Sequence, residues 1–537
     1  MRTGIRAQLK VAPSQVAADA GGGGGNGVCI VHVVRLAPLH LRAARRLRYG
    51  RRIAKRLETM PRLSRRSFLA ASAVLAARPA FAAAPSAPET DVVIVGAGAA
   101  GIAAARRIAA AGRKYVLLEA ADHVGGRCIT DTQIFGVPYD RGAHWIHTPD
   151  LNPVTKQVPR RGLEIYPAPA SQKVRIGRRF ARAGELEDFL ALQVRANRAI
   201  AEAARRGDVP CAQALPNDLG DWRPLIEFLL GPFTCGKELA DVSAVDFAKS
   251  AERNADAFCR QGFGTLIAAL AEGVAPRLST PATAIDTRRN VQVETPKGTI
   301  TARAAIVTVS TNVLSSGAIR FTPELAPRLL EAFDKLSLGS YDHVALELAD
   351  NPLGFESDDF ALEKSADART GAILANVSGT PLCLVEVAGS FGRDLAAHGE
   401  AAMVDFAADW LAGLYGSDVK KAVKRSHATR WNHEPLVRGA FSAAAPGFEH
   451  ARRVLMEPAQ NGVWFAGEAV HETLWGTVGG AWASGERAAD AVLHRLSGFS
   501  EPAAETEPPK RNVRRTGAAP RRQRFQAAPR IMRDEPR

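Results

Sequence analysis

The sequence lacks closely spaced cysteines. Its six cysteines are scattered over 537 residues, and no two of them form a C-x-x-C pair. This spacing argues against a zinc site and against a dithiol redox motif. Five cysteines follow residue 84, and an odd number leaves at least one thiol without an internal partner. We therefore predict buried free thiols, no disulfide framework and no metal site.

The sequence also lacks an apolar run that suits a stable membrane span. The apolar residues 68–77 are too short to cross a bilayer but match the apolar region of a signal peptide. Arg65 and Arg66 precede this run, and residues 80–82 (A-F-A) supply a cleavage site. The paired arginines resemble a twin-arginine export signal, a route that carries folded proteins with their cofactor. We expect export through the Tat translocase to the periplasm or beyond, although a basic linker before a buried helix is the alternative.

The central part of the chain lacks a net positive charge, although the whole chain has a formal net charge of +15. Residues 1–84 carry +14 and residues 501–537 carry +5, which leaves −4 for residues 85–500. Surfaces that bind nucleic acids are basic because they neutralise phosphates. The central part therefore gives no argument for a nucleic-acid partner.

The length predicts two joined domains between two tails, because 537 residues exceed the size at which one hydrophobic core keeps growing. Residues 1–84 are expected to be an N-terminal extension that ends in the signal peptide, with the true start near Met60. Residues 499–537 are rich in Pro, Arg and Ala and contain few large apolar side chains. Such a segment cannot offset its ordering entropy, so we expect a disordered basic tail.

A glycine-rich motif marks the start of the predicted folded body. A β-branched run leads into G-x-G-x-x-G at Gly96, Gly98 and Gly101, an alanine-rich helix follows, and a second predicted strand ends at Glu119. Gly96 allows a tight turn, Gly98 lets the backbone approach a pyrophosphate, and Gly101 permits close helix–strand packing. The helix N-terminus offers N–H groups to phosphates, and Glu119 can accept hydrogen bonds from ribose hydroxyls. This order predicts a dinucleotide site without choosing between FAD and a nicotinamide cofactor.

Further blocks resemble the flavin amine oxidase (monoamine oxidase-like) family over roughly residues 90–495. They are V-G-G-R at 124–127, D-R-G-A-H-W-I-H at 140–147 with N-P at 152–153, L-G-S-Y-D-H-V at 338–344, W-N-H-E-P at 431–435, R-G-A-F-S at 438–442, F-A-G-E at 465–468 and G-T-V-G-G-A at 476–481. Because blocks near both ends of the body belong to one cofactor site in that family, the resemblance favours FAD.

The resemblance implies an α/β fold with a Rossmann-like FAD-binding domain of the G-x-G-x-x-G type and an interleaved, mixed α+β substrate domain. The FAD-binding domain would comprise residues 90–150, 255–320 and 450–495, and the substrate domain residues 151–254 and 321–449. Residues 186–204 predict an amphipathic helix; such segments cover the substrate entrance in this family, although a plain surface helix is the commoner alternative. The implied cofactor-binding residues are Gly96, Gly98, Gly101, Glu119, Gly125, Gly126, Arg127, Ala282, Trp431, Gly467, Glu468, Gly476, Thr477 and Val478.

Within this set the resemblance implies distinct roles. Arg127 would neutralise the diphosphate, Ala282 would contact adenine through its backbone, and Glu468 would bind the ribityl chain. The helix that begins after Gly476 would direct the positive end of its dipole at the flavin. Ala440 occupies the place of the cysteine that carries covalent FAD in mitochondrial monoamine oxidases, so FAD should bind non-covalently.

The implied catalytic positions are His343, Trp431 and Phe441. His343 replaces a lysine that, in the family, holds a water near flavin N5 and assists the reaction with oxygen. Histidine can also hold a water, but it is shorter and can be neutral. Phe441 matches one wall of the family's aromatic sandwich, Thr477 replaces the tyrosine of the other wall, and the neighbouring Trp475 is a candidate substitute.

The implied activity is oxidation of an amine or amino acid. Hydride leaves the carbon that bears the neutral amine, the imine hydrolyses to an aldehyde or keto acid plus ammonia, and the electrons reach oxygen as hydrogen peroxide. Two alternatives stay open. One is an FAD-dependent dehydrogenase or desaturase that acts on a non-amine substrate and passes electrons to a carrier, which His343 and the incomplete sandwich favour. The other is a flavin-binding module without catalysis.

Overall fold

The structure, a computed structural model, describes residues 88–498 except 170–171 and 251–254. The predicted N-terminal extension, the signal peptide and the C-terminal tail lie outside these residues. Within the described part, no helix has the length and apolar character required to cross a bilayer. The five cysteines of this part are all buried: Cys128, Cys211, Cys235, Cys259 and Cys383.

The first sheet has eight strands in the order β10-β2-β1-β13-β12-β11-β14, and β20 adds to β13. The strands are β1 (Thr90–Val95), β2 (Tyr115–Leu118), β10 (Pro276–Arg277), β11 (Ala284–Asp286), β12 (Val291–Thr295), β13 (Gly298–Val307), β14 (Arg320–Thr322) and β20 (Val463–Phe465). Strands β2, β1, β13 and β20 run parallel, so their carboxyl ends lie at one edge of the sheet. Open α/β sheets bind ligands at this edge.

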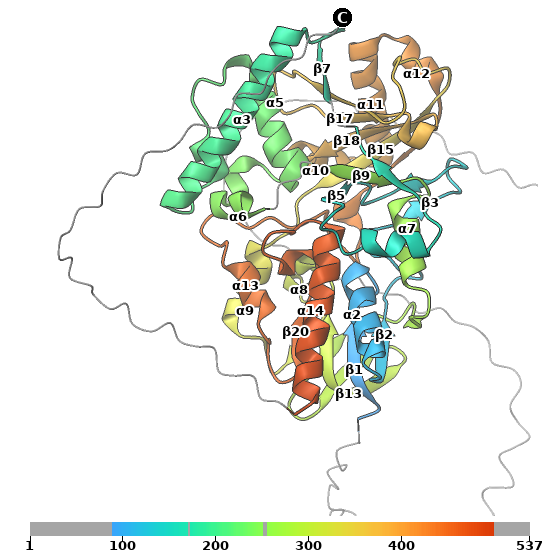
Figure 1. Cartoon of the computed structure of the whole chain (residues 1–537), viewed down its shortest axis with the longest axis vertical. Coiled ribbons are helices and arrows are strands. Elements are labelled where there is room, and N and C mark those ends of the chain that lie inside the picture. Colours follow the sequence, from blue (N-terminus) through green and yellow to red (C-terminus); the bar gives the residue numbers. More distant parts are fainter. Residues whose placement is uncertain (1–87, 170–171, 251–254, 499–537) are drawn as a thin grey trace, which may run out of the picture. The chain divides into compact units, whose positions relative to one another are not determined.

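Two helices pack closely on the first sheet, α2 (Ala99–Ala110) and α14 (Val478–Leu496), which lie side by side in Figure 1. Their buried residues are small where the helices meet. A Cβ added to Gly485 would lie only 2.1 Å from the backbone oxygen of Ala100. Glycine at this position therefore allows the two helices to approach closely. Their contact brings together residues that are almost 400 positions apart in the sequence.

The second sheet has seven strands in the order β19-β15-β18-β17-β16-β7-β8, antiparallel except for the β16–β7 pair. The strands are β7 (Gln172–Ile176), β8 (Arg179–Phe180), β15 (Tyr341–Leu348), β16 (Asp359–Glu363), β17 (Ala372–Ala375), β18 (Leu382–Ala388) and β19 (Val423–Ala428). Smaller sheets pair β3 (Thr130–Asp131) with β4 (Tyr139–Asp140), and β9 (Asp256–Cys259) with β5 (Ile146–His147) and β6 (Ile165–Pro167).

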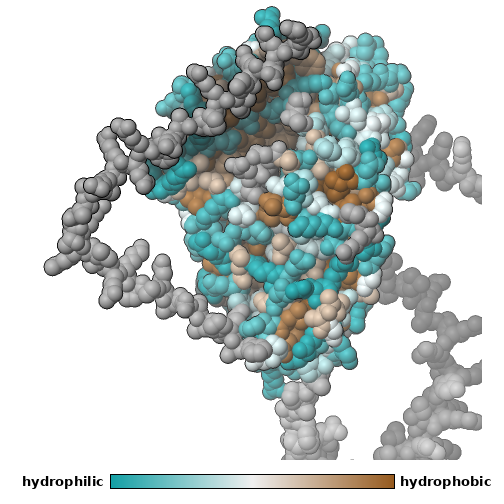
Figure 2. Space-filling model, viewed as in Figure 1, coloured by the Kyte–Doolittle hydropathy of each residue, from teal (hydrophilic) through white to brown (hydrophobic). Residues whose placement is uncertain are grey.

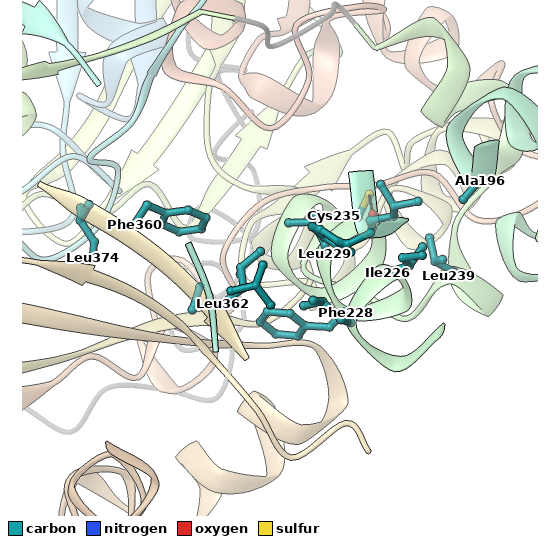
Figure 3. Close-up of a cluster of buried hydrophobic side chains, with 14 of the residues drawn as sticks. Ala196, Ile226, Phe228, Leu229, Cys235, Leu239, Phe360, Leu362 and Leu374 are labelled. Carbon is teal, nitrogen blue, oxygen red and sulfur yellow. Dashed lines mark hydrogen bonds between the residues drawn. The ribbon is translucent and has the colours of Figure 1, made fainter. Parts of the chain in front are cut away.

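Helices cover both faces of the second sheet because alternate strand residues point to opposite sides. On one face, Leu362, Leu374 and Leu384 pack with α3 (Ala183–Arg206), α5 (Arg223–Phe228) and the π-helical turn η4 (Leu229–Phe233). Figure 3 shows strand residues such as Phe360 and Leu362 beside Phe228 and Leu229 of this helical layer. On the other face, Ile373 and Val385 pack against α11 (Glu400–Tyr415).

The remaining helices are α4 (Cys211–Ala214), α6 (Ala244–Lys249), α7 (Phe263–Leu270), α8 (Thr311–Ser315), α9 (Pro327–Lys335), α10 (Gly389–Ala397), α12 (Asp418–Ala422) and α13 (Ala451–Met456). The predicted fold class, a Rossmann-like domain with an interleaved α+β domain, is confirmed. Strands of the first sheet come mainly from the three predicted FAD-binding segments. Helix α9, assigned from the sequence to the substrate domain, packs instead in the core of the first sheet through Leu329 and Phe333. The exact domain boundaries stay a prediction.

Candidate active site

A cavity of about 1410 Å³ extends from the carboxyl edge of the first sheet to the second sheet and α3. Pockets for one small molecule measure roughly 300–1,000 Å³, so this cavity has room for a dinucleotide and a substrate together. Every residue predicted for the site lines the cavity except Gly101, including His343, Trp431 and Phe441.

The glycine-rich loop forms the turn between β1 and α2. Gly96 has φ +104°, a conformation that side chains disfavour. A Cβ on Gly101 would lie 1.8 Å from the Gly96 carbonyl oxygen, so Gly101 acts through packing and not by facing the cavity. Helix α2 has no side-chain cap at Gly98 and no acidic residue in its first turn. Its first N–H groups are therefore available to phosphate oxygens.

Glu119 lies at the carboxyl end of β2, where two backbone donors hold its side chain. Ala97 N donates to Glu119 Oε2 at 2.6 Å, and Ala121 N donates to Oε1 at 2.8 Å. The backbone of Thr280 also donates to the Glu119 carbonyl at 2.7 Å, which brings the segment with Ala282 beside Glu119. The residues predicted to bind ribose and adenine thus lie at one end of the cavity.

Arg127 and Glu468 form an ion pair between the two ends of the chain. Arg127 Nη1 lies 3.0 Å from Glu468 Oε1 and also donates to the Ala440 carbonyl at 2.5 Å. Ser442 donates its hydroxyl to Glu468 Oε2 at 2.7 Å, and Gly476 N donates to the same oxygen at 2.9 Å. Burial acts to raise the pKa of Glu468, but the Arg127 charge and the Ser442 hydroxyl outweigh it, so the pKa lies below its ordinary value. Glu468 is therefore held ionised.

The N-terminus of α14 points its first turn at the cavity, where Gly476, Thr477 and Val478 all form part of the lining. The Thr477 side chain caps the helix by accepting from Gly480 N at 2.9 Å. Gly467, which begins the segment before the helix, has φ +140° and also lines the cavity. The positive end of this helix dipole is thus placed to stabilise negative charge on a bound ligand.

Trp431 is fixed by two hydrogen bonds that leave one side of its ring to the cavity. Its Nε1 donates to the Arg141 carbonyl at 3.0 Å, and its backbone N donates to Asp342 Oδ1 at 2.8 Å. A Cβ on Gly142 would come within 3.0 Å of the indole, so the glycine makes room for the ring. Burial raises the pKa of Asp342 to about 7, although the hydrogen bonds from Trp431 and Thr429 act in the opposite direction.

His343 is buried on β15 and lines the cavity. Its Nδ1 donates to the Asp140 carbonyl at 3.1 Å, which leaves Nε2 as the acceptor of the neutral ring. Burial lowers the pKa of His343 to about 4, against the raising effect of that carbonyl. His343 is therefore uncharged near neutral pH, unlike the lysine at the matching position of the family that the sequence resembles.

An aromatic wall, defined by Trp145, Phe233, Tyr341, Phe360 and Phe441, continues the cavity beyond His343. Successive ring centroids lie 5.6 Å apart for Trp145 and Phe360, 5.5 Å for Phe360 and Phe233, 5.8 Å for Phe233 and Tyr341, and 5.7 Å for Tyr341 and Phe441. These spacings are those of favourable edge and tilted contacts. Tyr341 thus contacts the predicted wall residue Phe441.

The expectation that Trp475 supplies the second wall of an aromatic sandwich is wrong. Its side chain is fully buried away from the cavity, and its Nε1 donates to the Asp246 carbonyl at 3.3 Å. The Arg452 guanidinium, paired with Asp246, lies 4.8 Å from its ring centre. Trp475 therefore belongs to a structural cluster, and Tyr341 has the place beside Phe441.

Sequence reasoning missed Tyr341, Phe233 and Phe360 as lining residues. Tyr341 precedes His343 by two positions in a strand, and alternation on a strand puts such residues on the same face, so this signal was available. Phe233 and Phe360 lie in stretches with weak resemblance to the family, and only the packing of η4 on β16 brings them together.

Asp140 and Glu386 are two further buried carboxyl groups near His343. Asp140 accepts hydrogen bonds from Phe263 N, Gly264 N and the Thr130 hydroxyl. Glu386 lies directly opposite His343 on β18, and burial raises its pKa to about 7. A lone glutamate inside a strand carries no sequence signal for this position.

The residues present fit FAD. Unpaired N–H groups at the start of α2, the cradle of Gly96 and Gly98, the Arg127 cation and the held carboxylates of Glu119 and Glu468 supply donors and acceptors for a phosphate-and-ribose chain. Among the described residues, no group of three His, Cys, Asp or Glu side chains is arranged to hold a metal ion.

The family described as flavin containing amine oxidoreductase matches residues 99–493. The chain belongs to that family. FAD is accordingly its cofactor, and alanine at position 440 cannot form a thioether with it.

Curated relatives agree with this membership. A mouse lysine-specific histone demethylase 1B is 27% identical over 75% of this chain and 52% of its own length, and polyamine oxidase 2 from Arabidopsis thaliana is 26% identical over 75% of this chain and 88% of its own. The chain thus spans about half the length of the first two relatives, which are histone demethylases.

Solved structures share the fold. Cyclohexylamine oxidase from Brevibacterium oxydans IH-35A has a TM-score of 0.64 at 19% identity, over 76% of this chain and 100% of its own. A putrescine oxidase bound to putrescine has a TM-score of 0.65 at 20% identity, over 76% of this chain and 99% of its own.

Proposed function

We propose that this protein oxidises an amine with FAD as the acceptor of the hydride. The observation that supports this most is that one cavity is lined by Gly96, Glu468, His343 and the aromatic wall, although Gly96 and Glu468 lie far apart in the sequence. Polyamine oxidase, cyclohexylamine oxidase and putrescine oxidase, the similar proteins named above, act on amines by their names.

The overall reaction balances without a side-chain nucleophile. When bound, FAD would supply the acceptor for a hydride from the carbon that bears the neutral amine, and loss of a proton from the amine nitrogen would leave an imine. Water then adds to the imine and releases ammonia with the aldehyde. Oxygen takes up the two electrons with two protons and leaves as hydrogen peroxide.

The side chains of the cavity contribute position and charge. Arg127 and the start of α2 hold the negatively charged part of the cofactor, and the dipole of α14 stabilises negative charge at its other end. Trp431 and Phe441 line the cavity and would confine the substrate beside the cofactor, which converts binding energy into orientation. His343 offers a neutral acceptor nitrogen that can hold a water or the amine N–H.

Stoichiometry of turnover tests this proposal. The FAD-loaded protein is incubated with an amine while oxygen consumption, ammonia and hydrogen peroxide are measured together. Equal amounts of all three are expected. Ammonia that forms only with an added electron carrier would identify a dehydrogenase, and the absence of ammonia, aldehyde and hydrogen peroxide with every amine would overturn the proposal.

We also propose export by the twin-arginine route, supported by Arg65, Arg66 and the apolar residues 68–77, all of which lie outside the described residues. The Arg65→Lys and Arg66→Lys double substitution is expected to retain the protein in the cytoplasm with its FAD, whereas the parent is recovered outside it. Equal fractionation of both proteins would contradict this route.

A further inference from the structure

One end of the cavity, here called the substrate chamber, is built by α3, η4 and the second sheet. Its defining residues are Leu190, Gln193, Leu230, Phe233, Tyr341 and Phe360, all of which line the cavity. The Tyr341 ring centre lies 5.8 Å from the His343 ring, so the chamber directly adjoins His343. Figure 2 shows a broad apolar area in the upper part of the view, where Figure 1 draws α3.

The polar side chains among these six residues are the amide of Gln193 and the hydroxyl of Tyr341. Gln172 Nε2 donates to Gln193 Oε1 at 3.5 Å, which ties α3 to β7. Leu190 and Val194 of the same helix are exposed by 40% and 51%, so apolar side chains extend from the chamber to the surface of α3. The chamber therefore offers apolar contact and hydrogen bonds, and none of its six defining residues is charged.

Among the described residues, four carboxylates line the cavity, and each lies outside the substrate chamber. Glu119 is held by backbone amides at the end of β2, and Glu468 is paired with Arg127. Asp256 lies 2.8 Å from His147 Nδ1, and Glu434 is exposed in the loop after Trp431. None of the four is among the six residues that define the chamber.

The carboxyl of Glu386 lies behind the chamber and does not line it. Its Oε1 accepts from Trp145 Nε1 at 3.5 Å and lies 3.8 Å from His343 Nε2, and the residue is fully buried. Burial raises its pKa to about 7, while hydrogen bonds from Tyr341 and Trp145 act in the opposite direction.

These observations restrict the body of the substrate. A second ammonium group, or the carboxylate of an amino acid, would lose its water in the chamber without meeting an opposite charge, and burying an unpaired ion is costly. A cation–π contact with Tyr341 or Phe233 returns less than that desolvation costs. An aliphatic or aromatic body instead gains from leaving water.

We propose that the substrate is a monoamine whose body is apolar and uncharged, and that polyamines and amino acids are discriminated against in the chamber. This inference rests on the proposed amine oxidation. The proposed monoamine substrate differs from the substrates that the names of the similar polyamine oxidase and putrescine oxidase would suggest.

Matched substrate pairs test the inference on the FAD-loaded protein without oxygen, where loss of flavin absorbance reports amine oxidation. Hexylamine is compared with 1,6-diaminohexane, and phenethylamine with phenylalanine, so that each pair differs by one charged group. Each monoamine is expected to react with a second-order rate constant at least about tenfold above that of its partner. Thermal stabilisation of the protein by the same compounds supplies a binding readout.

Substitution of one chamber residue sharpens the test. Gln193→Glu adds a carboxylate of the same shape, so it should shift the preference towards 1,6-diaminohexane by about tenfold. Gln133→Glu makes the same change at an exposed position outside the cavity and should leave the preference unchanged. Equal or faster reaction of the diamine and of phenylalanine in the parent protein would overturn the inference while the proposed function stands. Failure of every amine to react would overturn both.

Discussion

His343 and Glu386 face each other across the neighbouring strands β15 and β18, with His343 Nε2 3.8 Å from Glu386 Oε1. Burial acts on the two groups in opposite directions. It lowers the pKa of the imidazole to about 4 and raises the pKa of the carboxyl to about 7, because both neutral forms are favoured away from water. The pair therefore carries no charge at mildly acidic pH, where a lysine would be a cation.

Glu386→Gln should stabilise the protein most at alkaline pH. The pKa of Glu386 lies higher in the folded protein than its ordinary 4.5, so its contribution is fully favourable below pH 4.5 and is lost as the pH rises through 7. Relative to the parent, the variant should gain on the order of 3 kcal/mol in free energy of unfolding between pH 5 and pH 8. Urea unfolding of the FAD-loaded proteins measures this.

Glu331→Gln, at an exposed position on α9, is the control for that experiment. Its difference from the parent should not grow across this pH range. A Glu386→Gln variant that loses stability at pH 8 would show that the carboxyl is ionised and paired.

His343→Gln should change the rate of amine oxidation by a factor that does not depend on pH above about 5.5. Because burial lowers the pKa of His343 to about 4, the ring stays neutral over that range, and glutamine is neutral throughout. The ratio of parent to variant rates is measured from pH 6 to pH 9. A ratio that changes severalfold between pH 6 and pH 8 would reveal a histidine that titrates there.

Arg127→Ala should weaken FAD binding about ten- to a hundredfold, since one charged hydrogen-bonding group contributes about 1.5–3 kcal/mol. FAD retention during dialysis and the affinity measured by fluorescence check this. Arg328→Ala removes an arginine from the exposed ion pair with Glu457 and should leave FAD affinity unchanged. Equal FAD affinity of the two variants would contradict the predicted role of Arg127.

Gly485→Ala should destabilise the protein by about 1–3 kcal/mol, because its methyl group would lie 2.1 Å from the Ala100 carbonyl oxygen between α14 and α2. Gly413→Ala on α11 meets no atom within 4 Å and should be neutral or stabilise by up to about 1 kcal/mol. Denaturant unfolding compares the two variants. Similar effects would mean that the helices can separate without cost.

The cofactor end of the site could be predicted from the sequence because local backbone requirements specify it. Gly96, Gly101 and Glu119 belong to one strand–helix–strand unit, whose geometry follows from turn and packing rules that act over about thirty residues. The blocks at Glu468 and Thr477 could be joined to it by resemblance, and the parallel strands β13 and β20 place them at the same sheet edge.

The substrate end could not be predicted to the same extent. Its lining depends on how side chains from η4, β15 and β16 pack across the second sheet, and residues such as Phe233 and Phe360 are ordinary core residues by sequence. Trp475 shows the reverse case. It lies next to the site in sequence, but its side chain packs with the Asp246–Arg452 ion pair in a structural cluster.

Anaerobic mixing of the FAD-loaded protein with phenethylamine, with the flavin absorbance recorded before and after air is admitted, tests the account most directly. The absorbance is expected to fall as the amine is oxidised and to recover in air with release of hydrogen peroxide. A flavin absorbance that stays constant with phenethylamine, hexylamine and 1,6-diaminohexane would contradict amine oxidation.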